Sequence, residues 1–112
     1  MAKLECTLRG SKNTILRMID HQLMEGSFSA SYEDGSDFSL GAVECAVRVY
    51  ERYSIAGGNR VSLNITLFGK DTVWKLSAVT SGGSRAALFK MNTFGEESFL
   101  QELENAVKQF RE

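Results

Sequence analysis

Apolar residues recur at every second position through the middle of the chain, and this period most constrains what the chain can fold into. The segments 43–53 and 60–68 both alternate in this way, and a third run follows over 74–78. A period of two is typical of a β-strand with one buried face. The connections are short, so we expect antiparallel hairpins, with a two-residue turn at Lys70-Asp71 between the second and third strands.

The two sides of the segment 43–53 differ in character, and this difference predicts which side is buried. Val47 and Val49 are expected to point into the core, because their side of the strand is apolar throughout. With the turn at the position given above, Leu67 pairs with Trp74, so apolar residues meet across the strands. The side expected to face outward carries Arg48, Tyr50 and Arg52.

The N-terminal third predicts a strand followed by a helix. Residues 2–9 alternate between apolar and polar side chains, and Ser11 can cap a helix that runs over 12–25. Gly26 is expected to end this helix in the left-handed conformation. A further strand over 27–32 then ends in a turn at the polar run "EDGSD".

The segment "TSGGSRAALFKMNTFGEESFL" (80–100) raises a choice between a turn and an anion-binding loop. Gly82-Gly83 lies between two alternating runs, which predicts a hairpin turn and a returning strand through Met91. A phosphate loop would lead straight into a helix, whereas the first helix signal here is a capping box at Thr93. The sequence therefore favours the turn, followed by a C-terminal helix. The apolar stripe of this helix consists of Phe99, Leu100, Leu103, Val107 and Phe110.

The order of these elements predicts an α+β fold of the type β-α-β(4–5)-α, in which an antiparallel sheet carries two helices on one face. This order resembles that of TATA-binding-protein repeats and of the helix-grip ligand carriers related to birch-pollen allergens. A length of 112 residues fits a single domain over 1–112.

Three strings of the sequence resemble a known family: "VYERYS" (49–54), "GGNRVSLNITL" (57–67) and the segment 80–100. The family consists of small proteins from Gram-positive bacteria and is known only as a domain of unknown function. The resemblance covers essentially the whole chain. It implies a bacterial, cytoplasmic protein, and it brings no catalytic residue and no cofactor.

Charge and composition argue against several classes of partner. Thirteen basic residues against fourteen acidic ones leave a net charge of −1, which gives little attraction to nucleic acid. The apolar runs are too short for a membrane span, and "MAKLECTLRG" lacks the apolar stretch of a signal peptide, so we expect a cytoplasmic protein. Cys6 and Cys45 are expected to be reduced thiols buried in the core.

Catalysis and metal binding find little support. His21 is the only histidine, and it lies away from the apolar stripe of its helix, so the sequence lacks a set of zinc ligands. The acidic run "EDGSDF" favours a turn over a calcium loop, because the later bidentate glutamate is missing. We therefore expect no catalytic residue, no metal and no cofactor.

The outward face of the sheet is the strongest candidate for a binding surface. The ordinary interpretation is a solvated polar face. The functional hypothesis is a non-enzymatic binding or assembly module that uses this face, or a cavity between sheet and helix, for a small anionic ligand, a peptide or a second subunit. The candidate binding residues are Arg48, Tyr50, Arg52, Arg60, Asn64, Lys75, Arg85 and Leu88.

A small enzyme is the alternative hypothesis. The loops "SIAGGNR" and "SGGSR" are both expected at one end of the sheet, where Arg60 and Arg85 would hold an anion. No nucleophile or general base accompanies them, so the binding hypothesis is favoured.

Overall fold

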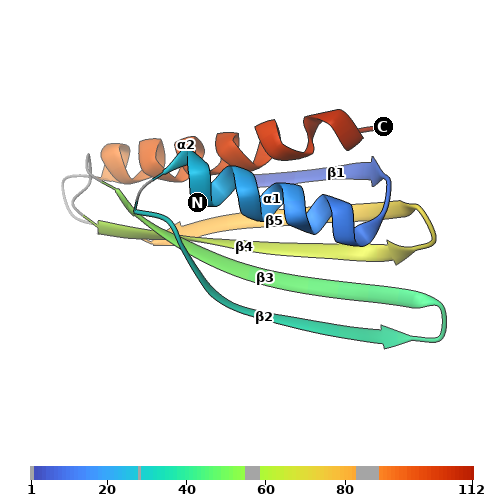
Figure 1. The fold of residues 1–112 in the computed structure, drawn as a ribbon. Helices are drawn as coiled ribbons and strands as arrows, with labels where there is room; N and C mark the ends of the chain where they lie inside the picture. The colour runs from blue at the N-terminus through green and yellow to red at the C-terminus, as the bar shows by residue number, and fades with distance from the viewer. Residues whose placement is uncertain (1, 28, 55–58, 83–88) are drawn as a thin grey trace.

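A computed structural model of the chain describes residues 2–27, 29–54, 59–82 and 89–112. It shows a curved antiparallel sheet with two long helices on one side (Figure 1). The elements in chain order are β1 (Lys3–Arg9), α1 (Lys12–Gly26), β2 (Ser31–Leu40), β3 (Val43–Ser54), β4 (Asn59–Lys70), β5 (Val73–Gly82), α2 (Phe89–Val107) and the short 3-10 helix η1 (Lys108–Phe110).

The strands form one sheet in the order β1-β5-β4-β3-β2, and every neighbouring pair is antiparallel. The first strand therefore pairs with the last one, while β2 to β5 follow one another as neighbours. This arrangement confirms the predicted α+β class, with both helices on the same face of the sheet (Figure 1). We call the face under the helices the inner face and the opposite one the outer face.

The hydrophobic core lies between the helices and the inner face. Trp74, Leu76 and Ala78 of β5 are buried there, as predicted from their alternation. The turn before β5 lies one residue later than predicted, at Asp71-Thr72. Each residue of β4 therefore pairs two positions further along β5 than predicted, and a shift by an even number leaves every side chain on its predicted face of the sheet. The helices contribute Ile15, Ile19, Leu23, Phe99, Leu103, Ala106 and Val107 to this core.

The expected strand beyond Gly82 is wrong in the part that the structure describes. Helix α2 begins at Phe89, before the expected capping box at Thr93, so the chain is helical where a strand through Met91 was predicted. The reason lies in the sheet, because both sides of β5 are already occupied by β4 and β1. A further strand has no place beside β5. Gly82 has a positive φ of 124° at the end of β5, and the rest of the expected turn lies outside the described residues.

The run "EDGSD" does not form a turn, because it lies within β2. The chain turns instead at Gly41-Ala42, where Gly41 adopts a φ of 63°. Strand β2 is an edge strand with a bulge at Glu33, and most of its side chains are exposed on both faces. A strand without a buried side shows no hydrophobic alternation, which explains why its sequence resembles a loop.

The sequence predicts the start of α1 correctly and its end wrongly. Ser11 caps the helix as predicted, since its Oγ accepts from the Thr14 N–H. The expected left-handed stop at Gly26 is wrong, because Gly26 is the last helical residue and is not among the described glycines with positive φ. A Cβ at this position would run into the Glu102 carboxylate of α2. A larger residue here would therefore displace the Glu102 side chain, which also accepts from Gln22 of α1.

The C-terminal residues close part of the β1 edge of the sheet. Arg111 forms a β-bridge with Leu8, and the Glu112 N–H donates to the Thr7 carbonyl at 3.0 Å. The Glu112 carboxylate also lies 2.7 Å from the Arg9 guanidinium. The other edge strand, β2, pairs with β3 alone.

Removal of the Leu103 side chain tests whether α2 is part of the core. Leu103 is fully buried, so Leu103→Ala should lower the free energy of unfolding by about 2–5 kcal/mol. Asn105→Ala, on the exposed side of the same helix, is the matched control and should change it by less than about 0.5 kcal/mol. Chemical denaturation of both variants measures the difference, and equal stabilities would contradict the packing of α2 on the sheet.

Candidate functional site

Strand β3 faces the helices with the side opposite to the one predicted. Ala46 and Tyr50 are buried on the inner face, where they pair with Leu67 and Leu63 of β4. The sequence placed this side of the strand outside and the valines inside, and that assignment is wrong. The candidate binding residues that consequently lie on the inner face are Arg48, Tyr50 and Arg52.

Contacts with α1 explain this orientation. The Tyr50 hydroxyl donates to Asp20 Oδ1 at 2.7 Å, and Lys12 Nζ lies 2.6 Å from Glu44 Oε1. The Tyr50 ring also packs edge-on against Tyr32, with 5.5 Å between ring centroids. A buried tyrosine removes the surface of a large ring from water while its hydroxyl keeps a hydrogen-bond partner. The side of β3 that carries Tyr50 therefore fits beneath α1, where Asp20 is that partner.

The two arginines on this side of β3 are engaged within the protein. Arg48 Nη2 lies 3.2 Å from the Asp37 carboxylate across the β2–β3 pair. The Arg52 guanidinium lies 4.6 Å from the centroid of the Phe99 ring, which is a cation–π contact. Burial lowers the pKa of Arg52, and the nearby Glu102 carboxylate opposes this effect. These cations therefore hold β3 to β2 and to α2, and they do not form a basic outer surface.

The outer face of β3 is apolar along most of the strand, and neither α1 nor α2 covers it (Figure 1). Phe38 of β2 and Phe68 of β4 lie on either side of Cys45 in one cross-strand row, and their side chains are 59% and 50% exposed. Leu40, at the end of β2, is 87% exposed. Contiguous apolar surfaces of this kind mark contact sites. We define the outer patch as Phe38, Leu40, Val43, Cys45, Val47, Val49, Phe68 and Val73.

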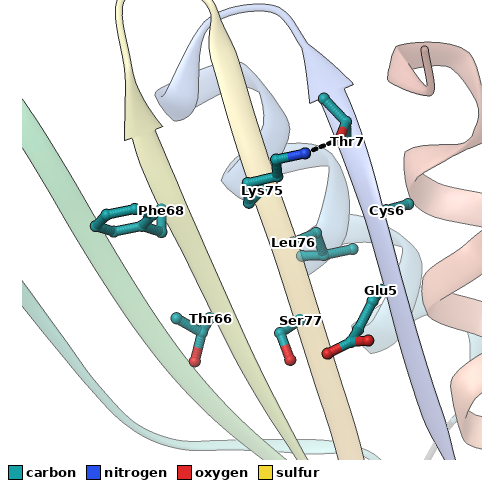
Figure 2. Close-up of a pocket in the computed structure, with 8 residues that line it drawn as sticks. All are labelled: Glu5, Cys6, Thr7, Thr66, Phe68, Lys75, Leu76 and Ser77. Atoms are coloured by element: carbon teal, nitrogen blue, oxygen red, sulfur yellow. Dashed lines mark hydrogen bonds between the residues drawn. The ribbon is translucent and has the colours of Figure 1, made fainter.

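Two shallow depressions lie beside Phe68 on this face. The first, of about 440 Å³, crosses β1, β5 and β4, and the second, of about 480 Å³, lies at the β4–β5 turn. Lys75 borders both, and its Nζ donates to Thr7 Oγ1 at 2.8 Å (Figure 2). The residues lining the first depression are Glu5, Cys6, Thr7, Thr66, Phe68, Lys75, Leu76 and Ser77. Both depressions are open to solvent, so they favour a broad contact with another surface over the enclosure of a small molecule.

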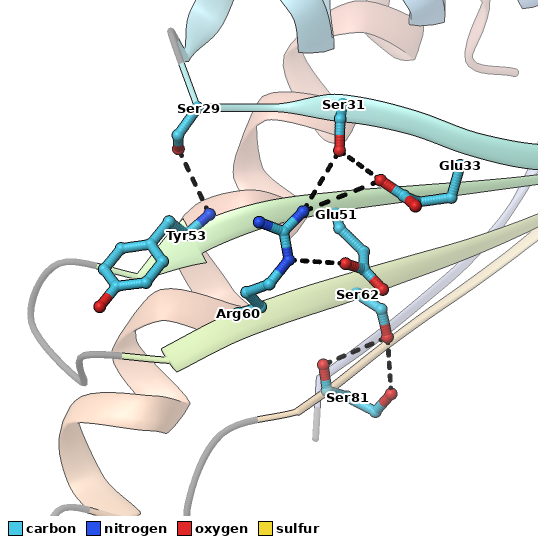
Figure 3. Close-up of polar contacts among 8 residues, drawn as sticks. All are labelled: Ser29, Ser31, Glu33, Glu51, Tyr53, Arg60, Ser62 and Ser81. Atoms are coloured by element: carbon cyan, nitrogen blue, oxygen red, sulfur yellow. Dashed lines mark hydrogen bonds and ion pairs between the residues drawn. The ribbon is translucent and has the colours of Figure 1, made fainter.

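The opposite end of the outer face is polar (Figure 3). Arg60 Nε lies 2.7 Å from Glu51 Oε1, and its Nη2 lies 3.8 Å from Glu33 Oε2. The hydroxyls of Ser62 and Ser81 are 2.9 Å apart on the neighbouring strands. Arg60 is thus held by carboxylates of two other strands, where the enzyme hypothesis requires it to hold an anion.

The remaining candidate residues are placed as follows. Arg60, Asn64 and Lys75 lie on the outer face, as predicted, with Asn64 exposed at its centre. Arg85 and Leu88 lie outside the described residues, and so does most of the "SIAGGNR" and "SGGSR" loops. The structure therefore places three of the predicted binding residues on the same face as a larger apolar surface that the sequence did not predict, with Arg60 and Lys75 toward opposite ends of this face.

The two cysteines lie on opposite faces of the sheet, and both are free thiols. Cys45 belongs to the outer patch, while Cys6 lies beside Leu76 on the inner face. Burial raises the pKa of the Cys6 thiol, against a lowering by Arg111. Both thiols are free, as predicted, and Cys6 packs against the core while only partly buried. Cys45 lies on the outer face, so the prediction that both thiols are buried in the core is wrong.

Within the described ranges, the chain shows neither a metal-binding cluster nor a membrane-spanning helix. No group of three or more histidine, cysteine, aspartate and glutamate side chains in these ranges could hold a metal ion. His21 is exposed on α1. No helix in the same ranges combines the length and the apolar character that a membrane crossing requires.

The sequence contained one signal that could have found the outer patch. Strand β3 carries apolar residues on both sides, Ala46 and Tyr50 on one and a run of valines on the other. Such a pattern is typical of a strand that is covered on both faces. Phe38 was missed for a different reason, because the strand that carries it was interpreted as a turn.

Comparison with protein-family models matches residues 1–111 to a family of unknown function. The match extends over all the strands and helices described above, and it agrees with the resemblance seen in the sequence. Searches among curated proteins and among solved structures found no match.

The Tyr50–Asp20 contact predicts a pH dependence of stability. Burial, and then the hydrogen bond and the charge of Asp20, raise the pKa of Tyr50 in the folded protein. The unfolded chain ionises this phenol near pH 10, so the contribution of Tyr50 is complete below about pH 10 and is lost as the pH rises further. Tyr50→Phe should cost about 1 kcal/mol at neutral pH, and its deficit relative to wild type should shrink above about pH 10. Urea unfolding at several pH values measures this, and a deficit that stays constant into the alkaline range would contradict the buried phenol.

Proposed function

The chain belongs to the family of unknown function DUF6054, and we propose that it is a non-enzymatic assembly module that binds a protein partner through the outer patch. The observation that carries this proposal is the orientation of β3, whose apolar side faces away from both helices. Exposed apolar surface costs about 25 cal/mol per Å² relative to burial. A partner that covers the patch would recover this free energy.

The chemistry of the outer face favours a protein surface over a small anionic ligand. Two of the cations that the sequence had proposed as anion-binding residues, Lys75 and Arg60, lie on this face. Each already has a partner, since Lys75 donates to Thr7 and Arg60 pairs with Glu51. The apolar centre and the polar margin reproduce the usual anatomy of a protein–protein interface. Asn64, exposed on β4 next to Val49, adds a side chain that can hydrogen-bond at the edge of the patch.

The proposal keeps the bacterial, cytoplasmic setting that the resemblance to the Gram-positive family implies. In a reducing cytoplasm the thiols of Cys6 and Cys45 would stay reduced. Cys45 can then act as a small apolar residue in the contact surface.

Photo-crosslinking at position 68 tests this proposal in the native cells. A benzophenone amino acid in place of Phe68 should give a discrete crosslinked protein species, because the ring lies at the centre of the proposed contact. The same amino acid in place of Met24, which is 38% exposed on α1, is the control and should give none. Equal yields at the two positions, or no crosslink at either, would overturn the proposal.

A further inference from the structure

On the premise of the proposed function, we infer that the partner at the outer patch is a second copy of this chain. The two copies would pack outer face against outer face around a two-fold axis that runs along β3. Cys45 of each copy would then lie next to the axis. The observations that support this arrangement are the positions of the aromatic residues and the distribution of charge, and the area of the patch limits its strength.

The register of the sheet makes the patch complementary to itself. Phe38, Cys45 and Phe68 lie in one row across β2, β3 and β4. A two-fold axis along β3 exchanges the strands on its two sides, so β2 of one copy lies over β4 of the other. Phe38 then faces Phe68 of the second copy, and this contact occurs twice. Aromatic rings that meet in this way attract one another beyond the effect of their buried area.

The next rows continue this match. Ser36, Val47 and Thr66 form the row beside the aromatic one, so two Val47 side chains would meet at the axis with a serine facing a threonine on each side. One row further on, Asp34 would face Asn64 of the second copy, an acceptor opposite a donor. Apolar groups thus meet at the axis, and hydrogen-bonding groups meet at the sides.

Charge is absent from the middle of this surface. Glu51 at one end is compensated within each copy, and the exposed Lys70 lies at the other end beside Val43 and Val73. The two rows centred on Cys45 and Val47 contain no charged residue on β2, β3 or β4. Glu51, farther along β3, would approach its symmetry mate, but Arg60 already pairs with it at 2.7 Å. The like-charge repulsion that would otherwise oppose the two-fold arrangement is therefore largely neutralised within each copy.

The area of the patch sets the expected strength of the dimer. Three strands, each contributing about nine residues, cover about 400 Å² in projection at ordinary strand spacing. Stable specific interfaces bury about 800 Å² per partner. The dimer should therefore be weak and reversible, with association visible at high micromolar concentration.

The two cysteines provide a matched pair of variants for the test. Cys6→Ser leaves only Cys45, at the proposed axis, and Cys45→Ser leaves only Cys6, on the inner face of a sheet edge. Packed sheets lie about 10 Å apart, so a short bismaleimide can join the two copies of Cys45. Cys6→Ser should give a covalent dimer and Cys45→Ser should give about tenfold less or none. Equal yields from the two variants would overturn the arrangement.

Sedimentation with charged substitutions tests the position of the axis. Phe68→Lys and Phe38→Glu are at exposed positions, and each alone should raise the dissociation constant by about tenfold or more. The double variant should recover much of this loss, because the introduced ammonium group of one copy would face the introduced carboxylate of the other across the axis. No recovery would overturn this position of the axis.

A wild type that remains monomeric at high micromolar concentration would overturn the second copy as the partner. A crosslink from position 68 to a different protein would then leave the proposed function standing. Failure of both experiments would remove both proposals.

Discussion

The rest of the surface depends on which side of β3 lies under α1. The hydrogen bond between Tyr50 and Asp20 forms only when the Tyr50 side lies there. A tyrosine ring buries about 150–250 Å² and gains a charged acceptor in that position, whereas a valine there would gain only its smaller apolar area. Once this side is turned inward, Arg52 reaches the Phe99 ring of α2 and Arg48 reaches Asp37 of β2. The valines must then point away from the helices. The polar interior contacts and the apolar exterior are therefore two results of one orientation.

The sequence predicted most of the fold, because its strongest signals are periodic. A period of two identifies β1, β3, β4 and β5, and Ser11 and the stripe through Leu103 identify the helices. The same period says that the two sides of β3 differ, but it does not say which side meets a helix. That choice depends on Asp20 and Tyr50, which lie 30 positions apart in the chain.

Two other differences between sequence and structure have the same physical origin. The strand predicted over 27–32 overlaps only the start of β2, because an edge strand exposed on both faces needs no alternation and only its pairing with β3 defines the rest. The expected strand through Met91 fails because β1 already occupies the free side of β5. Both outcomes depend on pairings between distant segments, so a local pattern could not decide them. The candidate site inherited the error in β3, since three of its predicted residues, Arg48, Tyr50 and Arg52, lie on the inner side of this strand.

The closure of the β1 edge by Arg111 and Glu112 limits how sheets of this kind can join side by side. A sheet with two open edges can add neighbours in both directions and grow into a fibre. Here β2 offers an unpaired edge, while the opposite edge is occupied in part by the end of its own chain. Two such sheets could pair once through their β2 strands, but the resulting unit would present partly blocked edges on both sides. Arg111 and Glu112 thus oppose the addition of further strands at the β1 edge.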